Sequence, residues 1–496
     1  MKVTIEGDAN RYYVQTLCMI FFPGAKFSEN EEITEETPEV VVHTSREGGA
    51  VTATVTISIG SLSSSYTHTA SREEGRRIDE GKIAVGIALF KAGEKLFGYT
   101  PSWGILTGVR PTKLAKELYA AGISNEEIRH ILCEEYIVNP KKAAIAADIA
   151  ENEARIINAL PPRSCSVYIS IPFCPSRCAY CSFVSYSTKR LLSMIPDYLI
   201  RLCEDIDRMF RVIRELDMKV VTIYIGGGTP TILEADQLSM LLECINRNLD
   251  RSYLMEFTLE GGRPDTITAE KLKAAADGGI TRVSINPQTL DDHILEAIGR
   301  RHTADDFFRA YAIARESGIK YINTDLIAGL PGEKFAGFAH SVDTVLAMRP
   351  DNVTFHTFCV KKAADILKSG TEVYSRTGGD TGKSVDYSQL RARLAGYIPY
   401  YLYRQKNTVG NFENVGYALP GAEGLYNIFI MEEIHSIFSA GAGGVTKLIP
   451  ADAPAYGPKK IERRFMPKYP YEYLAMDRAT QIEPFFDELL RVMHET

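Results

Sequence analysis

Hydrophobic and polar positions follow two different patterns, and the change between them divides the chain. From about residue 165, short β-branched runs alternate with amphipathic stretches. The runs are Val167–Ile171, Val220–Ile225, Met255–Leu259, Arg282–Asn286, Tyr321–Ile327 and Asn352–Phe358. The amphipathic stretches are Leu192–Leu216, Ala235–Leu249, Ala269–Ala276, Ala304–Ser317 and Phe335–Met348. This alternation predicts an α/β fold with six parallel strands covered by helices, arranged as an open partial (β/α)6 barrel over residues 164–368.

The first 135 residues are predicted to form a separate α+β domain. Strand-like patterns occur at Lys2–Glu6, Tyr12–Phe22, Glu39–His43 and Val51–Ile59. The Ser-rich stretch 61–66 is expected to be a loop or turn, and Glu73–Phe97 has helical spacing. Residues 112–159 have a helical pattern whose last helix starts at Asn139-Pro140, so 136–163 is interpreted as a helical linker.

After about residue 368 the pattern changes again. The Gly/Ser/Thr-rich patch 369–385 is predicted to be a loop. Helical stretches are expected at Tyr387–Arg404 and Asn427–Phe438. Residues 369–496 are therefore interpreted as a mostly helical C-terminal region that closes the barrel.

Charge and cysteine content narrow the class of protein. A formal net charge of −7 gives no reason to expect nucleic acid or an anionic membrane as the main partner. No apolar run reaches the roughly 18 residues that a membrane helix needs, and the N-terminus has no apolar signal core. Nine cysteines, three of them clustered, indicate a reducing cytoplasm and a metal site rather than a disulfide framework.

The clustered cysteines are Cys174, Cys178 and Cys181, directly after the first predicted strand of the barrel. Thiolate sulfur is the preferred protein ligand of iron–sulfur clusters, and a 4Fe–4S cluster normally takes four such ligands. Three thiolates on one loop would leave one iron open to another ligand. The alternative is zinc or ordinary buried thiols; a structural zinc site usually has a fourth Cys or His nearby, and Cys165 is poorly placed for that.

A second motif, Tyr-Ile-Gly-Gly-Gly-Thr-Pro, spans residues 224–230 and follows the next predicted strand. Three glycines after a strand allow a ligand to approach the backbone closely, although such a turn alone is weak evidence for a site. Here the turn follows the strand next after the cysteine loop.

Cys-x-x-x-Cys-x-x-Cys followed by Gly-Gly-Gly-Thr-Pro resembles the radical S-adenosylmethionine (SAM) enzymes, and more narrowly the oxygen-independent coproporphyrinogen III oxidase family. Further motifs of that family follow at 282–288 (Arg-Val-Ser-Ile-Asn-Pro-Gln), 298–302 (Ile-Gly-Arg-Arg-His) and 323–332 (Asn-Thr-Asp-Leu-Ile-Ala-Gly-Leu-Pro-Gly). The resemblance covers about 164–450. The segments 108–113, 404–407 and 413–417 are similar to the long branch of the family called HemZ.

The resemblance implies both cofactors and their ligands. Cys174, Cys178 and Cys181 would hold three irons of a 4Fe–4S cluster, and the fourth iron would chelate SAM, whose reductive cleavage yields a 5′-deoxyadenosyl radical. SAM contacts are implied for Tyr168, Gly227, Gly228, Thr229 and Glu260. Relatives that bind a second SAM use the equivalents of Tyr180, Gln288, Arg300 and Asp325. We also expect Asp325 and Arg300 to form a buried pair, because a buried carboxylate needs a partner.

The implied substrate is a tetrapyrrole, and the implied electron donor is a protein of the flavodoxin or ferredoxin type. Basic residues that could meet propionate groups are Arg404, Lys406 and Lys447, although solvated surface positions are more typical of such residues. His302 and His356 are more often surface or core histidines than functional ones.

Two positions depart from the family pattern. Ser170 stands where the family has His, and Phe183 stands where the decarboxylating oxidases have a fourth Cys. Three activities therefore stay open: oxidative decarboxylation of coproporphyrinogen III propionates to vinyls in heme biosynthesis, heme binding and transfer by a chaperone, and radical chemistry on heme itself, such as methylation or ring opening.

Overall fold

The computed structural model describes residues 1–22, 25–27, 34, 37–71, 79–108, 110–181, 185–359, 379–405, 408, 412–455, 457 and 459–495. The chain forms two compact units. The first comprises Met1–Glu151, Glu372–Gly382 and Leu402–Glu413; the second comprises Asn152–Thr371, Lys383–Tyr401 and Asn414–Thr496. None of the described helices is long and apolar enough to cross a bilayer.

The first unit contains a four-stranded sheet in the order β1-β2-β3-β4. The strands are β1 (Lys2–Glu6), β2 (Glu39–Glu47), β3 (Ala50–Ile59) and β4 (Leu62–Ser71). Strand β3 alternates buried and more exposed residues, as a strand with one covered face requires. Its buried side chains pack against α2 (Glu80–Phe97), and Phe21 of α1 (Arg11–Phe21) stacks on Phe97 with ring centroids 5.7 Å apart.

Two predictions for this unit were wrong. The segment predicted as a strand at Tyr12–Phe22 is helix α1, because Val14, Leu17, Cys18 and Phe21 share one buried face and Asn10 caps the first turn. The predicted Ser-rich loop at 61–66 lies largely in β4, whose serine hydroxyls hydrogen-bond across to hydroxyls of β3.

Other predictions for the N-terminal part were confirmed within the described residues. Helix α2 lies inside the predicted helical stretch, of which residues 73–78 fall outside the described ranges. The helical segment after it consists of α3 (Lys113–Ala120), α4 (Asn125–Glu134) and α5, which starts at Pro140 as expected and ends at Asn158.

The second unit contains the predicted parallel strands in chain order. They are β5 (Ser164–Ile171), β6 (Lys219–Gly227), β7 (Glu256–Glu260), β8 (Arg282–Ser284), β9 (Tyr321–Ala328) and β10 (Asn352–Thr357). Each strand pairs in parallel with the next one along the chain. The strand prediction is therefore confirmed.

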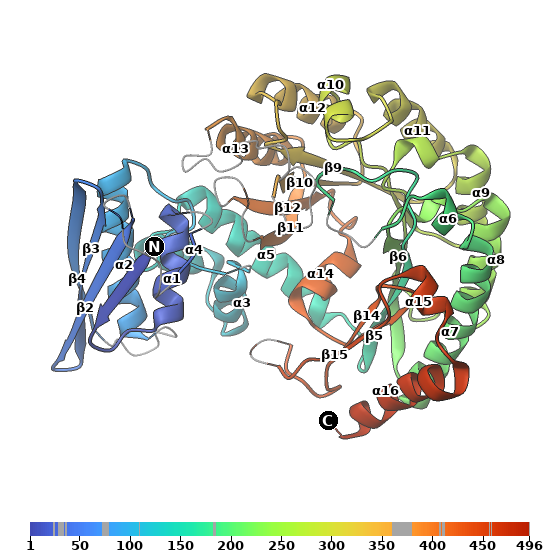
Figure 1. Ribbon diagram of the computed structural model, residues 1–496, viewed down its shortest axis with the longest axis horizontal. Coiled ribbons are helices and arrows are strands. Elements are labelled where there is room, and N and C mark those ends of the chain that lie inside the picture. The colour runs from blue at the N-terminus through green and yellow to red at the C-terminus, as the bar shows by residue number, and fades with distance from the viewer. Residues whose placement is uncertain are drawn as a thin grey trace. The chain divides into compact units, whose positions relative to one another are not determined.

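Helices follow the strands and lie outside them (Figure 1). The longer ones are α7 (Ile195–Glu215), α8 (Ala235–Asn246), α9 (Ala269–Asp277), α11 (Ala304–Glu316) and α12 (Phe335–Ala347). The shorter α6 (Lys189–Leu192) and α10 (Asp292–Ala297) lie in the connections after β5 and β8. This is the alternation that the hydrophobic pattern predicts.

The C-terminal segment adds strands to both edges of this parallel set. Strand β12 (Glu413–Ala418) pairs antiparallel with β10, and β13 (Ile437–Ala440) pairs in parallel with β5. The whole sheet has the order β11-β12-β10-β9-β8-β7-β6-β5-β13-β14-β15. The other strands are β11 (Ile398–Arg404), β14 (Val445–Leu448) and β15 (Glu462–Phe465), and the helices are α13 (Gly379–Leu394), α14 (Leu425–Glu432), α15 (Pro470–Leu474) and α16 (Glu483–Glu495).

The helix predictions at Tyr387–Arg404 and Asn427–Phe438 were correct only for their first parts. Helix α13 ends before strand β11, and helix α14 ends before strand β13. Both strands pair within the large sheet. Within the predicted loop 369–385, residues 369–378 lie outside the described ranges and the remainder begins α13.

A buried ion pair lies at the opposite strand ends from the cysteine motif. Glu256 and Arg282, the first residues of β7 and β8, approach to 3.3 Å with 4% and 5% of their side chains exposed. Arg282 also donates to the carbonyls of Ala422 and Glu423 at 3.0 and 2.9 Å. Glu256 accepts from the backbone N–H of Leu425 at 2.7 Å, so the pair binds the backbone at the start of α14.

Candidate functional site

The three clustered cysteines lie on the loop that leaves the carboxyl end of β5. The backbone N–H of Cys174 donates to the carbonyl of Tyr186 at 3.0 Å, and that of Tyr186 donates to Pro172 at 2.9 Å. These bonds close the loop at its base. None of the three cysteines forms a disulfide, and Cys174 is buried while the other two are half-buried. They are thus available as ligands on one short, anchored segment.

The glycine-rich turn after β6 packs directly against the base of this loop. The N–H groups of Gly228 and Thr229 donate to the carbonyls of Ile171 and Phe173 at 2.8 and 2.7 Å. A Cβ atom on Gly228 would lie 2.5 Å from the Phe173 carbonyl oxygen, so a side chain there would force the two segments apart. Glycine at position 228 therefore allows the backbone of the turn to pack closely against the backbone at the base of the cysteine loop.

Two side chains from neighbouring loops reach the cysteine sulfurs. The Thr229 hydroxyl donates to Cys174 Sγ at 3.3 Å. Arg263, 3% exposed on the loop after β7, donates to the Ser176 hydroxyl at 2.9 Å and lies 3.8 Å from Cys178 Sγ. Asp265 holds this guanidinium with two bonds of 2.9 and 2.8 Å. In iron–sulfur proteins, hydrogen bonds to the sulfurs and nearby positive charge change the reduction potential of the cluster.

The Ile-Gly-Arg-Arg-His motif holds the other side of the loop. The N–H of Ala179 donates to the Ile298 carbonyl at 2.9 Å. Gly299 has a φ of +77°, and a Cβ atom there would lie 3.3 Å from the Arg177 carbonyl oxygen. The next residue, Arg300, points back to the cysteine loop and donates to the Tyr180 hydroxyl at 3.2 Å.

The predicted pair between Asp325 and Arg300 does not form. Arg300 instead donates to the carbonyls of Asn286 and Gly262 at 2.7 and 3.2 Å, besides Tyr180. Asp325 accepts from Asn323 at 3.0 Å and lies 3.5 Å from His356 Nε2. Arg300 is satisfied by the loops at the strand ends, whereas Asp325 lies within β9. Among the described residues, the buried Arg300 guanidinium has no carboxylate within ion-pair distance.

Gln288 lies beside Arg300 in a strained backbone conformation. Its φ of +70° is in the left-handed region, which costs a non-glycine residue of order 1–3 kcal/mol. Two backbone bonds, to the Asp325 carbonyl at 3.0 Å and from the Ile327 N–H at 2.9 Å, hold it there. Its buried Oε1 makes no hydrogen bond with the protein, and neither does the buried Oδ1 of Asn286. The strained backbone and the unsatisfied acceptors make this a candidate position for a polar ligand.

Glu260 ends β7 beside the glycine turn. A Cβ atom on Gly226 would lie 2.8 Å from Glu260 Oε2, so this glycine makes room for the carboxyl group. Burial, and then the charge of Asp325, raise the pKa of Glu260 to about 8. At neutral pH the side chain is therefore largely protonated when no ligand is bound.

Three tyrosines from β5, β6 and α14 stack beside Glu260. Tyr224 and Tyr426 are closest, with ring centroids 4.6 Å apart, and Tyr168 stacks on both at 6.1 and 6.2 Å. Burial and the charge of Glu260 raise the pKa of each hydroxyl, which keeps them neutral.

Arg263, Tyr224 and Tyr426 were missed by the sequence analysis. Arg263 stands three residues after Glu260, on the loop at the carboxyl end of a predicted strand, which was the available signal. The position of Tyr426 depends on the docking of α14 and has no local signature.

His302 is 2% exposed, and burial together with the charge of Arg300 lowers its pKa to about 3, so it is a neutral core histidine.

Other positions singled out from the sequence have structural contacts. The Ser170 hydroxyl, in the place of the family's His, donates to the Ala442 carbonyl at 2.7 Å. Arg404 is 5% exposed and donates to the carbonyls of Leu106 and Gly108, so it is not a solvated residue. Lys447 lies 3.5 Å from Glu433. Lys406 and Phe183 lie outside the described residues.

The residues present fit a 4Fe–4S cluster and SAM. Within the described ranges, no group of three or more His, Cys, Asp or Glu side chains is arranged around a single metal ion. A cubane cluster distributes its thiolate ligands over separate irons, so three thiolates on one loop can hold three irons and leave the fourth open. The buried guanidinium of Arg300, which has hydrogen bonds but no carboxylate partner among the described residues, and the unsatisfied Gln288 Oε1 could both bind a zwitterionic ligand.

Comparisons with known proteins identify the family of this chain. The sequence profile of the radical SAM superfamily matches residues 168–345. The "Oxygen-independent coproporphyrinogen-III oxidase-like protein HemZ" of Bacillus subtilis is 37% identical over 401 residues, 80% of this chain and 78% of that protein. The "Heme chaperone HemW" of Lactococcus lactis is 31% identical over 56% of this chain and 69% of that protein. A solved structure of coproporphyrinogen III oxidase (HemN) from Escherichia coli matches 59% of this chain and 66% of that one, with a TM-score of 0.46 and 20% identity.

A parallel barrel whose first strand ends in a three-cysteine loop, braced by a glycine-rich turn after the second strand, defines a radical SAM protein, a class that uses a 4Fe–4S cluster and SAM. Within that class, the chain belongs to the family of oxygen-independent coproporphyrinogen-III oxidase-like proteins.

Proposed function

We propose that this protein is a radical SAM enzyme that acts on a tetrapyrrole, by oxidative decarboxylation of two propionates of coproporphyrinogen III to vinyls. The observation that carries the radical SAM part is the cysteine loop held between the glycine turn, Arg263 and the 298–302 motif. The tetrapyrrole part rests on the family and on the names of its relatives.

Cys174, Cys178 and Cys181 would bind the cluster, and SAM would occupy its open iron. When bound, these groups would supply the radical chemistry that removes hydrogen from an unactivated carbon. Thr229 and Arg263 would donate to the ligand sulfurs. The backbone of Gly227, Gly228 and Thr229 would position the methionine end of SAM.

The remaining contacts would orient SAM inside the barrel. Glu260 would accept from its amino group or ribose, and Tyr168 would close one side with its ring. Tyr180, Gln288, Arg300 and Asp325 would bind at the neighbouring position that relatives use for a second SAM. The buried guanidinium of Arg300 would pair with a carboxylate there, and Gln288 Oε1 would accept from a donor.

SAM affinity is expected to rise with pH up to about 8, because the pKa of Glu260 is raised to about 8. SAM carries ammonium and sulfonium charges that favour the ionised carboxylate. Binding below that pH therefore releases a proton, and affinity changes by up to about tenfold per pH unit. Calorimetric titration at several pH values, in buffers of different ionisation enthalpy, measures both effects.

Glu260→Gln removes the titrating group and should flatten this pH dependence. Glu296→Gln, at an exposed position on α10, serves as the matched control and should retain the wild-type profile. A wild-type affinity for SAM that is independent of pH between 6 and 8 would exclude Glu260 from the SAM site.

Arg263→Gln is expected to lower the reduction potential of the cluster. It removes one hydrogen bond and one positive charge beside Cys178. A contact of about 1–2 kcal/mol corresponds to roughly 40–80 mV for one electron. A redox titration followed by electron paramagnetic resonance checks this, with the exposed Arg301→Gln as control. An unchanged potential with full iron content would show that Arg263 only supports the loop.

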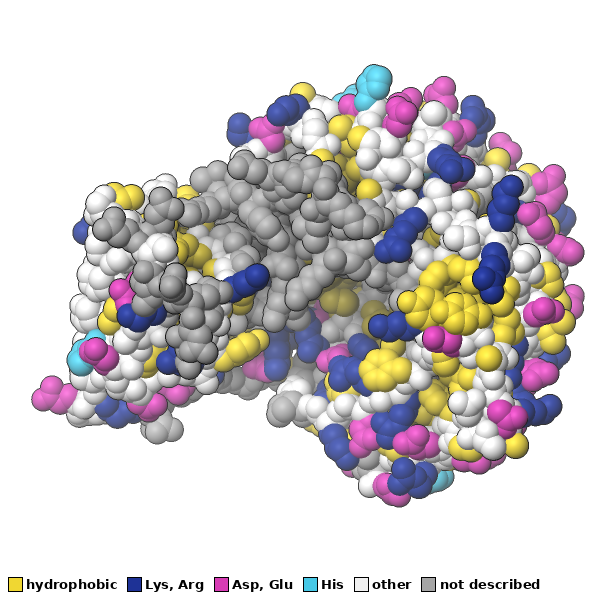
Figure 2. Space-filling model, in the orientation of Figure 1, with side chains coloured by type: hydrophobic (Ala, Val, Ile, Leu, Met, Phe, Trp, Pro, Cys, Tyr) yellow, Lys and Arg dark blue, Asp and Glu magenta, His cyan; other side chains and the backbone are white. Residues whose placement is uncertain are grey.

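We propose further that an acidic one-electron carrier of the flavodoxin or ferredoxin type docks beside the cysteine loop. Tyr469 and Tyr471 of the α15 region are 41% and 46% exposed, and Tyr469 packs on Tyr186 at the base of the loop with centroids 5.4 Å apart. Figure 2 shows hydrophobic side chains gathered over α15 with Lys and Arg side chains around them. Exposed basic residues here are Arg177, Lys189, Arg190 and Lys468.

Charge reversal at Arg190 and Lys468 should slow reduction by such a carrier roughly tenfold at low salt. Reduction by dithionite should be unaffected, because that reagent needs no docking surface. Stopped-flow bleaching of the cluster measures both rates. Equal slowing with both reductants, or no slowing with either, would argue against this surface.

The alternative function is heme binding and transfer. Several relatives carry the name heme chaperone HemW, and both Ser170 and Phe183 depart from the pattern of the decarboxylating oxidases.

The deciding experiment is anaerobic incubation with SAM, a reductant and either coproporphyrinogen III or heme. Release of 5′-deoxyadenosine that depends on coproporphyrinogen, with loss of carbon dioxide from the product, supports the enzyme. Tight heme binding with no substrate-dependent SAM cleavage supports the chaperone, and a modified heme supports radical chemistry on heme.

A further inference from the structure

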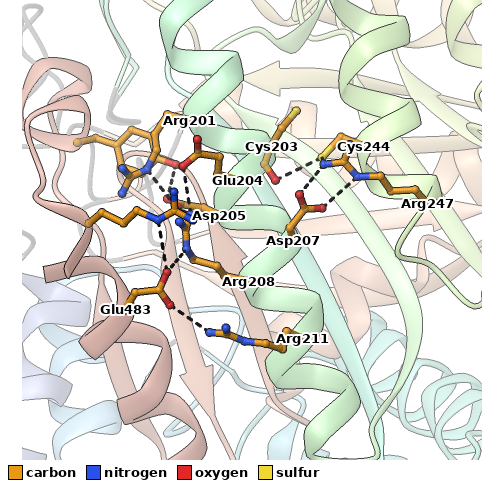
Figure 3. Close-up of polar contacts among 12 residues, drawn as sticks. Arg201, Cys203, Glu204, Asp205, Asp207, Arg208, Arg211, Cys244, Arg247 and Glu483 are labelled. Atoms are coloured by element: carbon orange, nitrogen blue, oxygen red, sulfur yellow. Dashed lines mark hydrogen bonds and ion pairs between the residues drawn. The ribbon is translucent and has the colours of Figure 1, made fainter.

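Two cysteines outside the cluster loop lie side by side on neighbouring helices. Cys203 is on α7 and Cys244 is on α8, in the helical layer outside β5 and β6 (Figure 3). The Cys244 thiol donates to the Cys203 carbonyl oxygen at 3.4 Å, so the Cys244 sulfur lies against the backbone of Cys203. The sequence analysis gave neither residue a role.

The surroundings make the two thiols different from each other. Cys244 is 2% exposed, whereas Cys203 is half-buried and reachable from solvent. Arg247 Nη2 lies 3.6 Å from Cys244 Sγ, and its guanidinium is held by Asp207, which also accepts from Asn248 at 2.6 Å. Cys244 lowers the pKa of Cys203 against the opposing effect of burial, and the charge of Arg247 adds to this lowering, whereas Cys203 and burial raise the pKa of Cys244.

This combination is typical of a reactive thiol with a resolving partner. Cys203 is partly exposed and its pKa is lowered, which favours the thiolate, and the neighbouring Cys244 can complete a disulfide. Cys133, which is also half-buried, has the opposite setting, since burial and Glu134 raise its pKa. Figure 3 shows the Asp207 carboxylate joined to the Arg247 guanidinium, by hydrogen bonds of 3.1 and 2.5 Å.

We propose that Cys203 and Cys244 form a reactive dithiol that small-molecule disulfides oxidise to an intramolecular disulfide. The Cys203 thiolate attacks one sulfur of the small disulfide, whose S–S bond breaks and releases one thiol. The Cys244 thiol then loses its proton and attacks Cys203 Sγ, which breaks the mixed disulfide and releases the second thiol. Two protein thiols are oxidised and one small disulfide is reduced to two thiols.

The disulfide would tie α7 to α8 and so link the first two strand–helix units of the barrel. The strands of these units, β5 and β6, lead into the cysteine loop and the glycine turn. The dithiol itself touches neither of those segments among the contacts of the described residues. It is therefore independent of the proposed function, and its test does not need a tetrapyrrole.

The test is anaerobic treatment of the full-length, cluster-containing protein with oxidised glutathione. Non-reducing peptide mapping by mass spectrometry should detect a Cys203–Cys244 linkage with the loss of two hydrogens. At pH 7, Cys203 should react about tenfold faster than Cys133. In Cys244→Ser the reaction should stop at a glutathione adduct on Cys203, and in Cys203→Ser neither the adduct nor the linkage should form.

Two results would overturn the proposal: a stable glutathione adduct on Cys203 in the wild-type protein without conversion to the linkage, or reaction of Cys203 no faster than Cys133. Cluster absorbance and circular dichroism of both serine variants establish that they are folded. Because their cluster and SAM cleavage should match the wild type, failure of the dithiol and failure of the enzyme are distinguishable.

Discussion

Replacing Cys178 by Ala is expected to abolish the brown absorbance that follows anaerobic reconstitution with iron and sulfide. The loop offers three thiolates, and the loss of one leaves two ligands for a cluster that requires three from the protein. Iron and sulfide content should fall to below about a tenth of the wild-type value. Chemical analysis and visible spectroscopy of the reconstituted protein measure this.

Cys165→Ala provides the matched control. Cys165 is fully buried near the first residue of β5, whereas the cysteine loop leaves the other end of that strand. This variant should retain the full cluster. Normal iron and sulfide in Cys178→Ala would refute the ligand assignment, and tetrahedral zinc in the wild-type protein purified without oxygen would remove the basis for radical chemistry.

Replacing Arg282 by Ala is expected to lower the free energy of unfolding of the barrel unit by about 3–5 kcal/mol. The substitution leaves the Glu256 carboxylate buried without its guanidinium partner, 4% exposed. It also removes two donors to the backbone of Ala422 and Glu423. Urea unfolding followed by circular dichroism measures the loss.

The exposed ion pair between Lys273 and Asp277 gives the comparison. These side chains are 75% and 64% exposed, and Lys273→Ala should cost less than about 1 kcal/mol. The double variant Glu256→Gln with Arg282→Met should recover part of the stability lost in Arg282→Ala, because no charge is then left buried alone. A cost for Arg282→Ala no larger than that for Lys273→Ala would show that the pair is dispensable.

The hydrophobic pattern was sufficient to predict the strands of the barrel but not the contacts between distant loops. Each predicted strand between residues 165 and 358 was found, because a strand buried on both faces has a continuous β-branched run that no other element shares. The cysteine loop and glycine turn were placed correctly at the carboxyl ends of β5 and β6 for the same reason. The positions of this loop and this turn depend only on where the strands end.

The wrong predictions have a common cause: contacts with distant parts of the chain outweighed the local sequence pattern. Segment Tyr12–Phe22 contains aromatic and β-branched residues, yet burial of one face against α2 makes it a helix. Arg300 was expected to pair with Asp325, but carbonyl oxygens of two other loops and the Tyr180 hydroxyl satisfy it first. These contacts depend on which distant segments meet in the folded chain. The spacing of residues along one sequence therefore does not predict them.

The pairing of β5 with β13 determines the order in which this protein can mature. The strand that leads into the cysteine loop receives its outer neighbour from residues 437–440, and Ser170 bonds to a carbonyl 272 positions further along the chain. During synthesis, that edge of β5 therefore stays uncovered until residues 437–440 have been made. A chain that stops before residue 437 would lack β13 and would expose an edge of β5 that is open to self-association.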